Sequence, residues 1–261
     1  MTSRPATPRS RRAGSRGVTL IELMIAVAIG LLLVVVLAQL FLGSRQTFAT
    51  TDDVSRMQDS IRFSQILMTR TIHLAGYKSQ ANSVTATVFK AFPALEAVDR
   101  AAPNSDDLIV RYQGSGDGAG VADGTVVDCL GAKVDAGQMI TNTFKIEKNL
   151  SSGRLGLTCN GAELVPDVLN MQIMFGEDLN GDLVADRYIT PDAVTVAGNM
   201  SNVVSVRVAL LFETPTETSK AVADATVYDM LGNNVEKLGP FADRRIRRLV
   251  VTTINLRNRT P

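Results

Sequence analysis

The sequence predicts an α+β fold in which a long N-terminal helix, transmembrane in its first part and amphipathic in its second, packs on an antiparallel β-sheet. Three observations predict this fold. An apolar run, residues 18–42, stands near the start of the chain. A stripe of apolar residues at helical spacing follows within residues 44–75, which contain no proline or glycine. After residue 77, short β-rich runs alternate with Gly, Asn and Asp, as in strands joined by turns.

Composition places much of the apolar character in one segment. Hydrophobic residues make up 45% of the 261 residues, but much of that share falls in residues 18–42, so the remainder has the composition of a soluble domain. Residues 1–17 contain five arginines and no acidic residue, which leaves the rest of the chain mildly acidic. Because a nucleic-acid-binding protein normally carries a clustered basic excess, we expect no direct contact with nucleic acid.

Residues 18–42 are long enough to cross a membrane. At about 1.5 Å per residue such a helix is roughly 37 Å long, and a hydrocarbon core is roughly 30 Å thick. The preceding arginines predict a cytoplasmic N-terminus at the inner membrane and a periplasmic location for the chain after residue 42. A cleaved secretory signal is the competing interpretation. The apolar run is too long for one, and no small-x-small cleavage site follows it.

One ionisable residue, Glu22, stands inside this apolar run. Such a group costs at least a few kcal/mol in a membrane segment, so it indicates a function and a partner. The free amine of a neighbouring helix would suit it, because burying either charge alone is costly. The alternative is a lone glutamate that reaches toward the cytoplasmic interface from near the helix end.

The stretch "RGVTLIELMIAVAIG", residues 16–30, resembles the signature of type IV prepilins and pseudopilins. The resemblance implies that residues 1–17 are a basic leader, that a prepilin peptidase cleaves after Gly17, and that Val18 becomes an N-methylated terminus. Glu22 takes the place of the fifth-position glutamate, which sets the register of a new subunit against the terminus of a neighbour. Val18 departs from the family, where phenylalanine or methionine is commoner at this position.

Residues 43–76 are predicted to continue the helix as an amphipathic segment. Their apolar stripe consists of Val54, Met57, Ile61, Met68 and Ile72. A glycine at position 76 is a plausible C-cap. We expect this half of the helix to pack against the sheet.

Residues 77–261 are predicted to form a β-rich globular domain, periplasmic or extracellular. The predicted strands are residues 108–113, 143–147, 154–159, 169–175, 187–190, 203–212 and 248–256. Between the first two lies "GSGDGAG", residues 114–120. It lacks the lysine of a P-loop and the GxGxxG spacing, which favours a flexible loop over a phosphate site.

Several segments of this domain resemble one branch of the family, the W-type minor pilins (PilW). They include "DDLIVRYQG" at 106–114, "FGEDLNGDLVADRYIT" at 175–190 and "RRLVVTTINLRNR" at 247–259. The resemblance implies a type IV pilin-like fold and a minor pilin that assembles with other major and minor pilins through its N-terminal helix. This branch is also similar to the J-type pseudopilins of type II secretion.

The two cysteines, Cys129 and Cys159, show neither a CxxC spacing nor a neighbouring histidine, which excludes the usual zinc and thioredoxin-like motifs. One intramolecular disulfide is expected if the domain faces an oxidising compartment. Two buried free thiols are the alternative.

A loop within residues 177–187 has oxygen-bearing side chains at alternate positions, as in extracellular calcium sites. The candidate ligands are Asp178, Asn180, Asp182 and Asp186, with the backbone carbonyl of Val184. Two features depart from such loops: Leu183 stands where glycine is usual, and Ile189 stands where a glutamate would be. The alternative is a hairpin turn at Asn180-Gly181. Four carboxylates close together, at residues 177, 178, 182 and 186, would repel one another without a cation, which favours a structural Ca²⁺ ion.

Enzymatic sites are poorly supported, and we expect a protein that is not an enzyme. The single histidine, His73, falls in the predicted helix, where a surface or sheet-contact role is expected. The acidic pairs 52–53 and 106–107 are interpreted as solvated or capping. The basic run "RRIRR", residues 244–248, is interpreted as the charged beginning of the last strand, with binding of DNA or an acidic partner as the alternative.

These features together predict a minor pilin that is inserted in the inner membrane, cleaved, and built into a type IV pilus. It would act in pilus assembly or initiation at or near the tip, in support of twitching motility and adhesion. A pseudopilin of a type II secretion system is the alternative. A membrane-anchored calcium-binding module that never polymerises is a further one.

Overall fold

A computed structural model describes residues 17–79, 89, 93–117, 119–218, 222–232 and 236–258. The predicted leader, except for Gly17, lies outside the described residues. The chain divides into two compact units, residues 1–48 and 49–261, each of which is described by itself below. The predicted α+β architecture, a long apolar N-terminal helix followed by antiparallel sheets, is confirmed.

Helix α1 runs over Leu20–His73 and has 54 residues. It begins two residues after the start of the apolar run. Of the predicted stripe, Met57, Met68 and Ile72 are buried, so this face of residues 49–73 supplies part of the domain core. Gly76 adopts φ 77°, a conformation in which glycine is unstrained, and its N–H donates to the carbonyl of Arg111.

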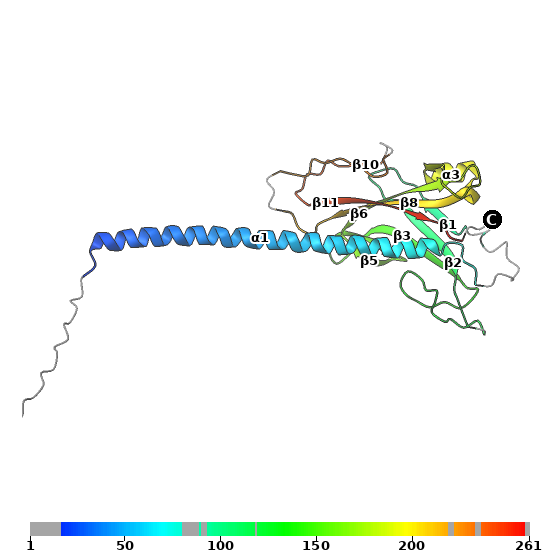
Figure 1. The fold of residues 1–261 in the computed structure, drawn as a ribbon, viewed down its shortest axis with the longest axis horizontal. Coiled ribbons are helices and arrows are strands. Elements are labelled where there is room, and N and C mark those ends of the chain that lie inside the picture. Colours follow the sequence, from blue (N-terminus) through cyan, green and yellow to red (C-terminus); the bar gives the residue numbers. More distant parts are fainter. Residues whose placement is uncertain are drawn as a thin grey trace, which may run out of the picture. The chain divides into compact units, whose positions relative to one another are not determined.

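The seven predicted strands fall in two antiparallel sheets, where the sequence predicted one (Figure 1). The five-stranded sheet has the order β1-β2-β3-β4-β5 and consists of Leu95–Val98, Asp107–Gln113, Met139–Lys148, Leu155–Cys159 and Ala162–Pro166. The four-stranded sheet has the order β11-β8-β6-β7 and consists of Arg247–Asn255, Val203–Glu213, Val168–Glu177 and Arg187–Ile189. All seven predicted strands occur, each within a few residues of its expected bounds.

Six short elements were not predicted. They are β1, β5, the helix α3 (Pro191–Ala197), the 3₁₀ turn Met200–Asn202, and the ribbon of β9 (Tyr228–Asp229) and β10 (Lys237–Leu238). In α3 the hydroxyl of Thr190 accepts from the N–H of Ala193, and Gly198 ends the helix with φ 69°.

Two apolar clusters hold the domain together on opposite faces of the four-stranded sheet. The larger cluster lies between α1 and the two sheets, and its largest buried side chains include Phe144, Phe175 and Phe212. The smaller one packs Met174, Leu211 and Met230 beneath the segment that carries β9 and β10. Successive side chains of β8 point alternately into the two clusters, so both faces of this strand are buried. Its sequence is therefore a nearly continuous apolar run.

Candidate functional site

Helix α1 begins with a capped first turn. The N–H of Glu22 donates to the hydroxyl of Thr19 over 3.3 Å, and the N–H of Leu23 donates to the carbonyl of Thr19 over 3.1 Å. Thr19 and Glu22 thus have the spacing of a capping box, in which a threonine is followed three residues later by a glutamate. This role of Thr19 was not predicted, although the T-x-x-E pattern could have indicated it.

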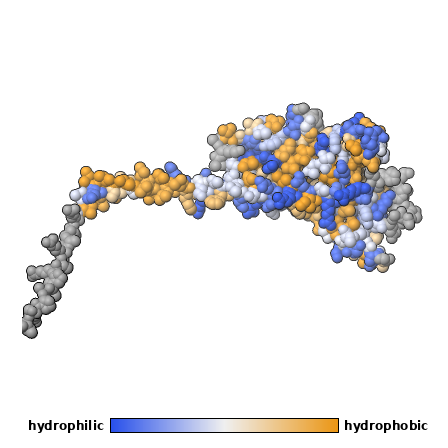
Figure 2. Space-filling model, viewed as in Figure 1, coloured by the Kyte–Doolittle hydropathy of each residue, from blue (hydrophilic) through white to orange (hydrophobic). Residues whose placement is uncertain are grey.

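The first unit is a helical segment with exposed apolar side chains. In the described part of this unit its large hydrophobic residues are 45–77% exposed, and Figure 2 shows it as predominantly hydrophobic. Helix α1 is long and apolar enough to cross a membrane. Glu22 is exposed, and no described residue forms a salt bridge with it. Gly17 and Val18 precede the helix and carry no regular structure.

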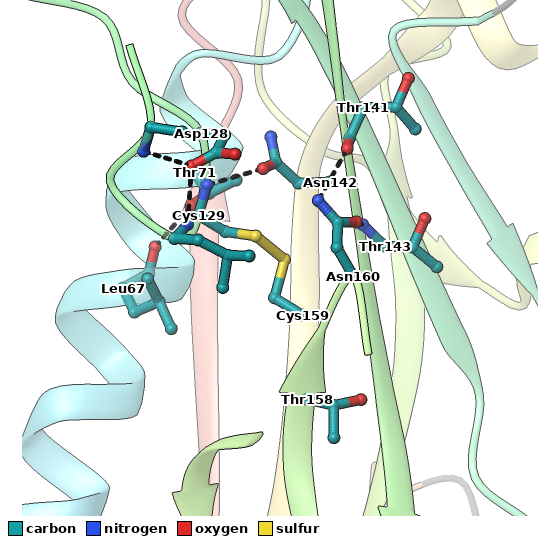
Figure 3. The surroundings of a disulfide bond; sticks show 12 residues. Leu67, Thr71, Asp128, Cys129, Thr141, Asn142, Thr143, Thr158, Cys159 and Asn160 are labelled. Carbon is teal, nitrogen blue, oxygen red and sulfur yellow. Dashed lines mark hydrogen bonds between the residues drawn. A yellow bond between two sulfur atoms is a disulfide. The ribbon is translucent and has the colours of Figure 1, made fainter. Parts of the chain in front are cut away.

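Cys129 and Cys159 form the predicted disulfide, with Cα atoms 6.4 Å apart, and the alternative of two free thiols is wrong (Figure 3). The bond joins the β2–β3 loop to the last residue of β4. Nearby, the N–H of Cys129 donates to Asn142 Oδ1 over 2.7 Å, and the hydroxyl of Tyr112 donates to the carbonyl of Val127 over 2.8 Å. Closing a loop of 30 residues stabilises the fold by about 3–4 kcal/mol in the chain-entropy description.

The candidate calcium loop joins β6 to β7 and turns around the carboxylate of Asp178. This carboxylate accepts hydrogen bonds from the N–H groups of Asn180, Gly181 and Leu183 at 3.1, 2.6 and 2.9 Å. Leu183 has φ 67°, a conformation that favours glycine, so the backbone takes the turn expected at this position despite the leucine. Strands β6 and β7 therefore form a hairpin, and the loop that connects them spans residues 178–186.

Three of the five predicted calcium ligands approach one another. Asn180 Nδ2 lies 3.3 Å from Asp182 Oδ2 and 3.3 Å from Asp186 Oδ1. The N–H of Val184 donates to Asp182, and the carboxylate of Asp178 is occupied by the backbone. No group of three or more His, Cys, Asp or Glu side chains suited to a metal ion occurs in the described parts of the chain. Calcium stays a prediction.

The expected repulsion among the four carboxylates is smaller than predicted, because one of them, Glu177, has its own cationic partner. Glu177 is fully buried and points to Arg187, whose Nε and Nη2 lie 2.8 Å from Glu177 Oε2. Asn199 donates to the other oxygen of Glu177. Repulsion that a cation would relieve therefore involves only the three aspartates of the loop, 178, 182 and 186.

Calcium binding is expected to raise the melting temperature of the full-length chain in detergent. With a dissociation constant on the order of 10⁻⁴ M, 10 mM Ca²⁺ would stabilise the fold by about 2.7 kcal/mol. Asp182→Asn and Asp186→Asn should remove that increase, whereas Asp192→Asn on α3 should retain it. Equal melting temperatures of the wild type in EDTA and in calcium would contradict the prediction.

Two family models match separate parts of the chain. The prokaryotic N-terminal methylation motif matches residues 12–38, which include the capped start of α1. The model of type IV pilus-assembly protein W, PilW, matches residues 138–258, which include β3 through β11. The chain is a PilW-like type IV prepilin. The motif implies processing by a prepilin peptidase and assembly with other pilins.

Among solved structures, a type IV-like pilin from Thermus thermophilus is similar to the prepilin with 14% sequence identity and a TM-score of 0.44, over 78% of this chain and 96% of that chain. No curated protein sequence matches the prepilin significantly. The family matches indicate a structural rather than an enzymatic protein.

The basic run of the prepilin, residues 244–248, is largely engaged in ion pairs. Arg247 is almost fully buried, with its side chain 2% exposed, and its guanidinium nitrogens lie 2.6 Å from Asp243, 3.1 Å from Glu213 and 3.4 Å from Asp224. The ring of Phe241 lies 3.7 Å from the guanidinium carbon. The hydrogen bond from Arg247 holds the pKa of Asp243 below its ordinary value.

The neighbouring arginines of this run have acidic partners as well. Arg245 binds Glu213 at 2.6 Å, and Arg244 binds Glu217 at 2.9 Å in an exposed pair. These contacts support the interpretation of the run as the charged beginning of β11. Nothing in the local pattern of residues indicates that one member of the run, Arg247, is the centre of a buried cluster.

The interpretation of residues 106–107 as solvated or capping is wrong, because both side chains are buried. Asp106 accepts from the N–H of Arg100 and from the N–H of Ile173, each at 2.8 Å, and so joins the beginning of β2 to β6 of the other sheet. Asp107 binds Arg100 in a two-point pair at 2.7 and 2.9 Å and lies 3.4 Å from Lys145. Burial raises the pKa of Asp106 to about 7.

The stability of the prepilin is expected to depend on pH through Asp106. An unfolded aspartate ionises near pH 4, whereas burial raises the folded pKa to about 7, so the folded state holds an additional proton between these values. The stability contributed by this proton is present at low pH and is lost as pH rises from about 4 to 7. In urea titrations at pH 5 and pH 7.5, Asp106→Asn should show less of this decrease than the wild type. The same decrease in both proteins would contradict the assignment.

His73 is the last residue of α1 and is half-buried. Its carbonyl accepts from Asn258 Nδ2 over 3.0 Å, which fastens the helix end to the chain after β11. Burial, together with the nearby charge of Arg257, lowers its pKa. These contacts agree with the predicted structural role.

Proposed function

We propose that this prepilin is a minor pilin of a type IV pilus that takes part in pilus assembly or initiation at or near the tip, in support of twitching motility and adhesion. The observation that carries the proposal is the pairing of two matches in one chain: the methylation motif at the start of an exposed apolar helix and the PilW model over the β-rich domain. The PilW match favours a pilus over a secretion pseudopilus.

In this proposal the peptidase cleaves after Gly17 on the cytoplasmic side of the inner membrane and Val18 becomes the methylated terminus. The helix anchors the subunit in the membrane with its domain in the periplasm, and later enters the core of the filament. Its exposed apolar side chains support this role, because they find apolar surroundings only in lipid or among other such helices. Glu22 provides the charge that pairs with the terminal amine of a neighbour.

Deletion of the gene tests the proposal. We expect pili on the cell surface, counted by electron microscopy, to be largely lost, and to return when the wild-type gene is supplied. A Gly17→Trp variant, which blocks the cleavage position with a bulky side chain, should accumulate as uncleaved precursor and should not restore pili. Normal piliation with defective protein secretion in the deletion strain would instead identify a secretion pseudopilin.

A further inference from the structure

Strand β11 leaves a long free edge on the domain. The four-stranded sheet ends with β11, which pairs only with β8 and runs for nine residues rich in β-branched side chains. The edge strands β7, β1 and β5 are much shorter, with three, four and five residues, and β5 ends in a proline. Short edges and prolines prevent unwanted strand pairing, whereas a long regular edge is a template for another strand.

Two hydrogen bonds at the ends of β11 determine which backbone groups face outward. The carbonyl of Ile246 accepts from Thr214, and the N–H of Leu256 donates to Val204. Hydrogen-bonded and non-hydrogen-bonded pairs alternate along an antiparallel ladder. The even-numbered residues of β11 therefore point their backbone N–H and C=O groups toward β8. The odd-numbered residues, including Leu249, Val251 and Thr253, point their N–H and C=O groups away from it. Within the described chain, no hydrogen bond reaches these outward groups.

A groove lies beside this edge, between α1 and β11. It is lined by Gln58, Ile61, Arg62, Gln65, Arg248, Leu249 and Val250. Arg62 and Arg248 are exposed, and neither forms an ion pair with a described residue. Ile66, one helical turn after Arg62, is 62% exposed, and Val251 is 46% exposed. Figure 2 shows hydrophobic surface in the region where Figure 1 places β11.

We propose that the free edge of β11 binds an extended, acidic segment of another pilin-like subunit by strand addition. The inference rests on the proposed function, which supplies the neighbouring subunits. Backbone hydrogen bonds to the odd-numbered residues provide affinity, and carboxylates of the added strand pair with Arg62 and Arg248. A second copy that pairs through its own β11 fits poorly, because that strand contains arginines and no acidic residue to pair with Arg62 and Arg248.

Val251→Pro tests the backbone part of the proposal. Proline removes one outward N–H but no bond to β8, and edge strands accept proline at such positions. The melting temperature of the full-length Val251→Pro variant should stay within about 5 °C of the wild-type value. The variant should nevertheless fail to restore pili in the deletion strain. Arg62→Glu combined with Arg248→Glu should have the same effect. Arg56→Glu is the matched control, because Arg56 is on the same helix but lines a different groove.

A photocrosslinking residue at Thr253 gives a readout that does not depend on piliation. We expect a crosslink to an acidic extended segment of another pilin-like subunit, lost in Val251→Pro. If Val251→Pro restores pili and leaves the crosslink unchanged, or if Thr253 crosslinks only to a second copy of this chain, the strand-addition site is wrong. A third outcome would separate the two proposals. If the crosslink forms but pili are present in normal number without this protein, the proposed function is wrong, whereas the β11 edge is still an interaction site.

Discussion

Replacing Arg247 with methionine is expected to lower the free energy of unfolding by about 3–5 kcal/mol. The guanidinium of Arg247 is buried, contacts the carboxylates of Glu213, Asp224 and Asp243, and lies over the ring of Phe241. Methionine fills similar space but leaves carboxylates desolvated without their cation, and an unpaired buried charge costs more than the pair contributes. Urea denaturation of the full-length chain in detergent measures the loss.

The same basic run provides a matched control. Arg244 pairs with Glu217, but both side chains are nearly half exposed, so Arg244→Met should cost no more than about 1 kcal/mol. Adding Asp243→Asn to Arg247→Met should recover part of the loss, because it removes one of the unpaired charges. If the methionine variants at 244 and 247 lost equal stability, the buried cluster would not be the source of the effect.

The sequence predicts the elements whose signal is local and repeated. The apolar run and the stripe of Met57, Met68 and Ile72 indicated α1, because helical spacing over many residues is a strong signal. The strands β6, β8 and β11 were predicted from short β-rich runs separated by Gly, Asn and Asp. The division of the seven predicted strands between two sheets was not predicted, because sheet membership depends on pairing between distant residues rather than on local pattern.

The short strands and helices were not predicted from the sequence, for a related reason. The β9–β10 ribbon has two residues in each strand, and no periodicity can be read from so few positions. It exists because Met230 and Leu238 cover the outer face of the four-stranded sheet, which is a tertiary requirement. Strand β5 carries Pro166, which argues against a strand in sequence but is tolerated at an edge.

The functional residues near the N-terminus could be predicted from the sequence, whereas the buried charged residues of the domain could not. Glu22 is evident because a charge in an apolar run is costly, and the two cysteines allow only one pairing. Asp106 and Arg247 looked like surface charges, since adjacent acids and basic runs usually are. Their burial follows from partners far away in the sequence, such as Ile173 for Asp106 and Glu213 for Arg247.

Substituting Glu22 with alanine is expected to abolish pilus assembly while the protein remains in the membrane. The pairing of this carboxylate with a terminal amine offsets a burial cost on the order of 3 kcal/mol, so its loss would weaken subunit docking by about two orders of magnitude. In the deletion strain, pili counted by electron microscopy should be at least tenfold fewer with Glu22→Ala than with the wild type. Immunoblots of membrane fractions check that the variant is inserted and cleaved after Gly17.

The capped start of α1 gives Glu22 a second role that must be separated from the first. Thr19 accepts from the N–H of Glu22, and in a capping box the glutamate in turn supports the first helical turn. In Glu22→Gln the side chain can still accept a hydrogen bond from the N–H of Thr19, as a capping box requires, but it carries no charge. If the charge acts in assembly, Glu22→Gln fails like Glu22→Ala, whereas Glu22→Asp retains part of the function. Full restoration of pili by Glu22→Gln would show that this residue caps the helix and does not pair with an amine.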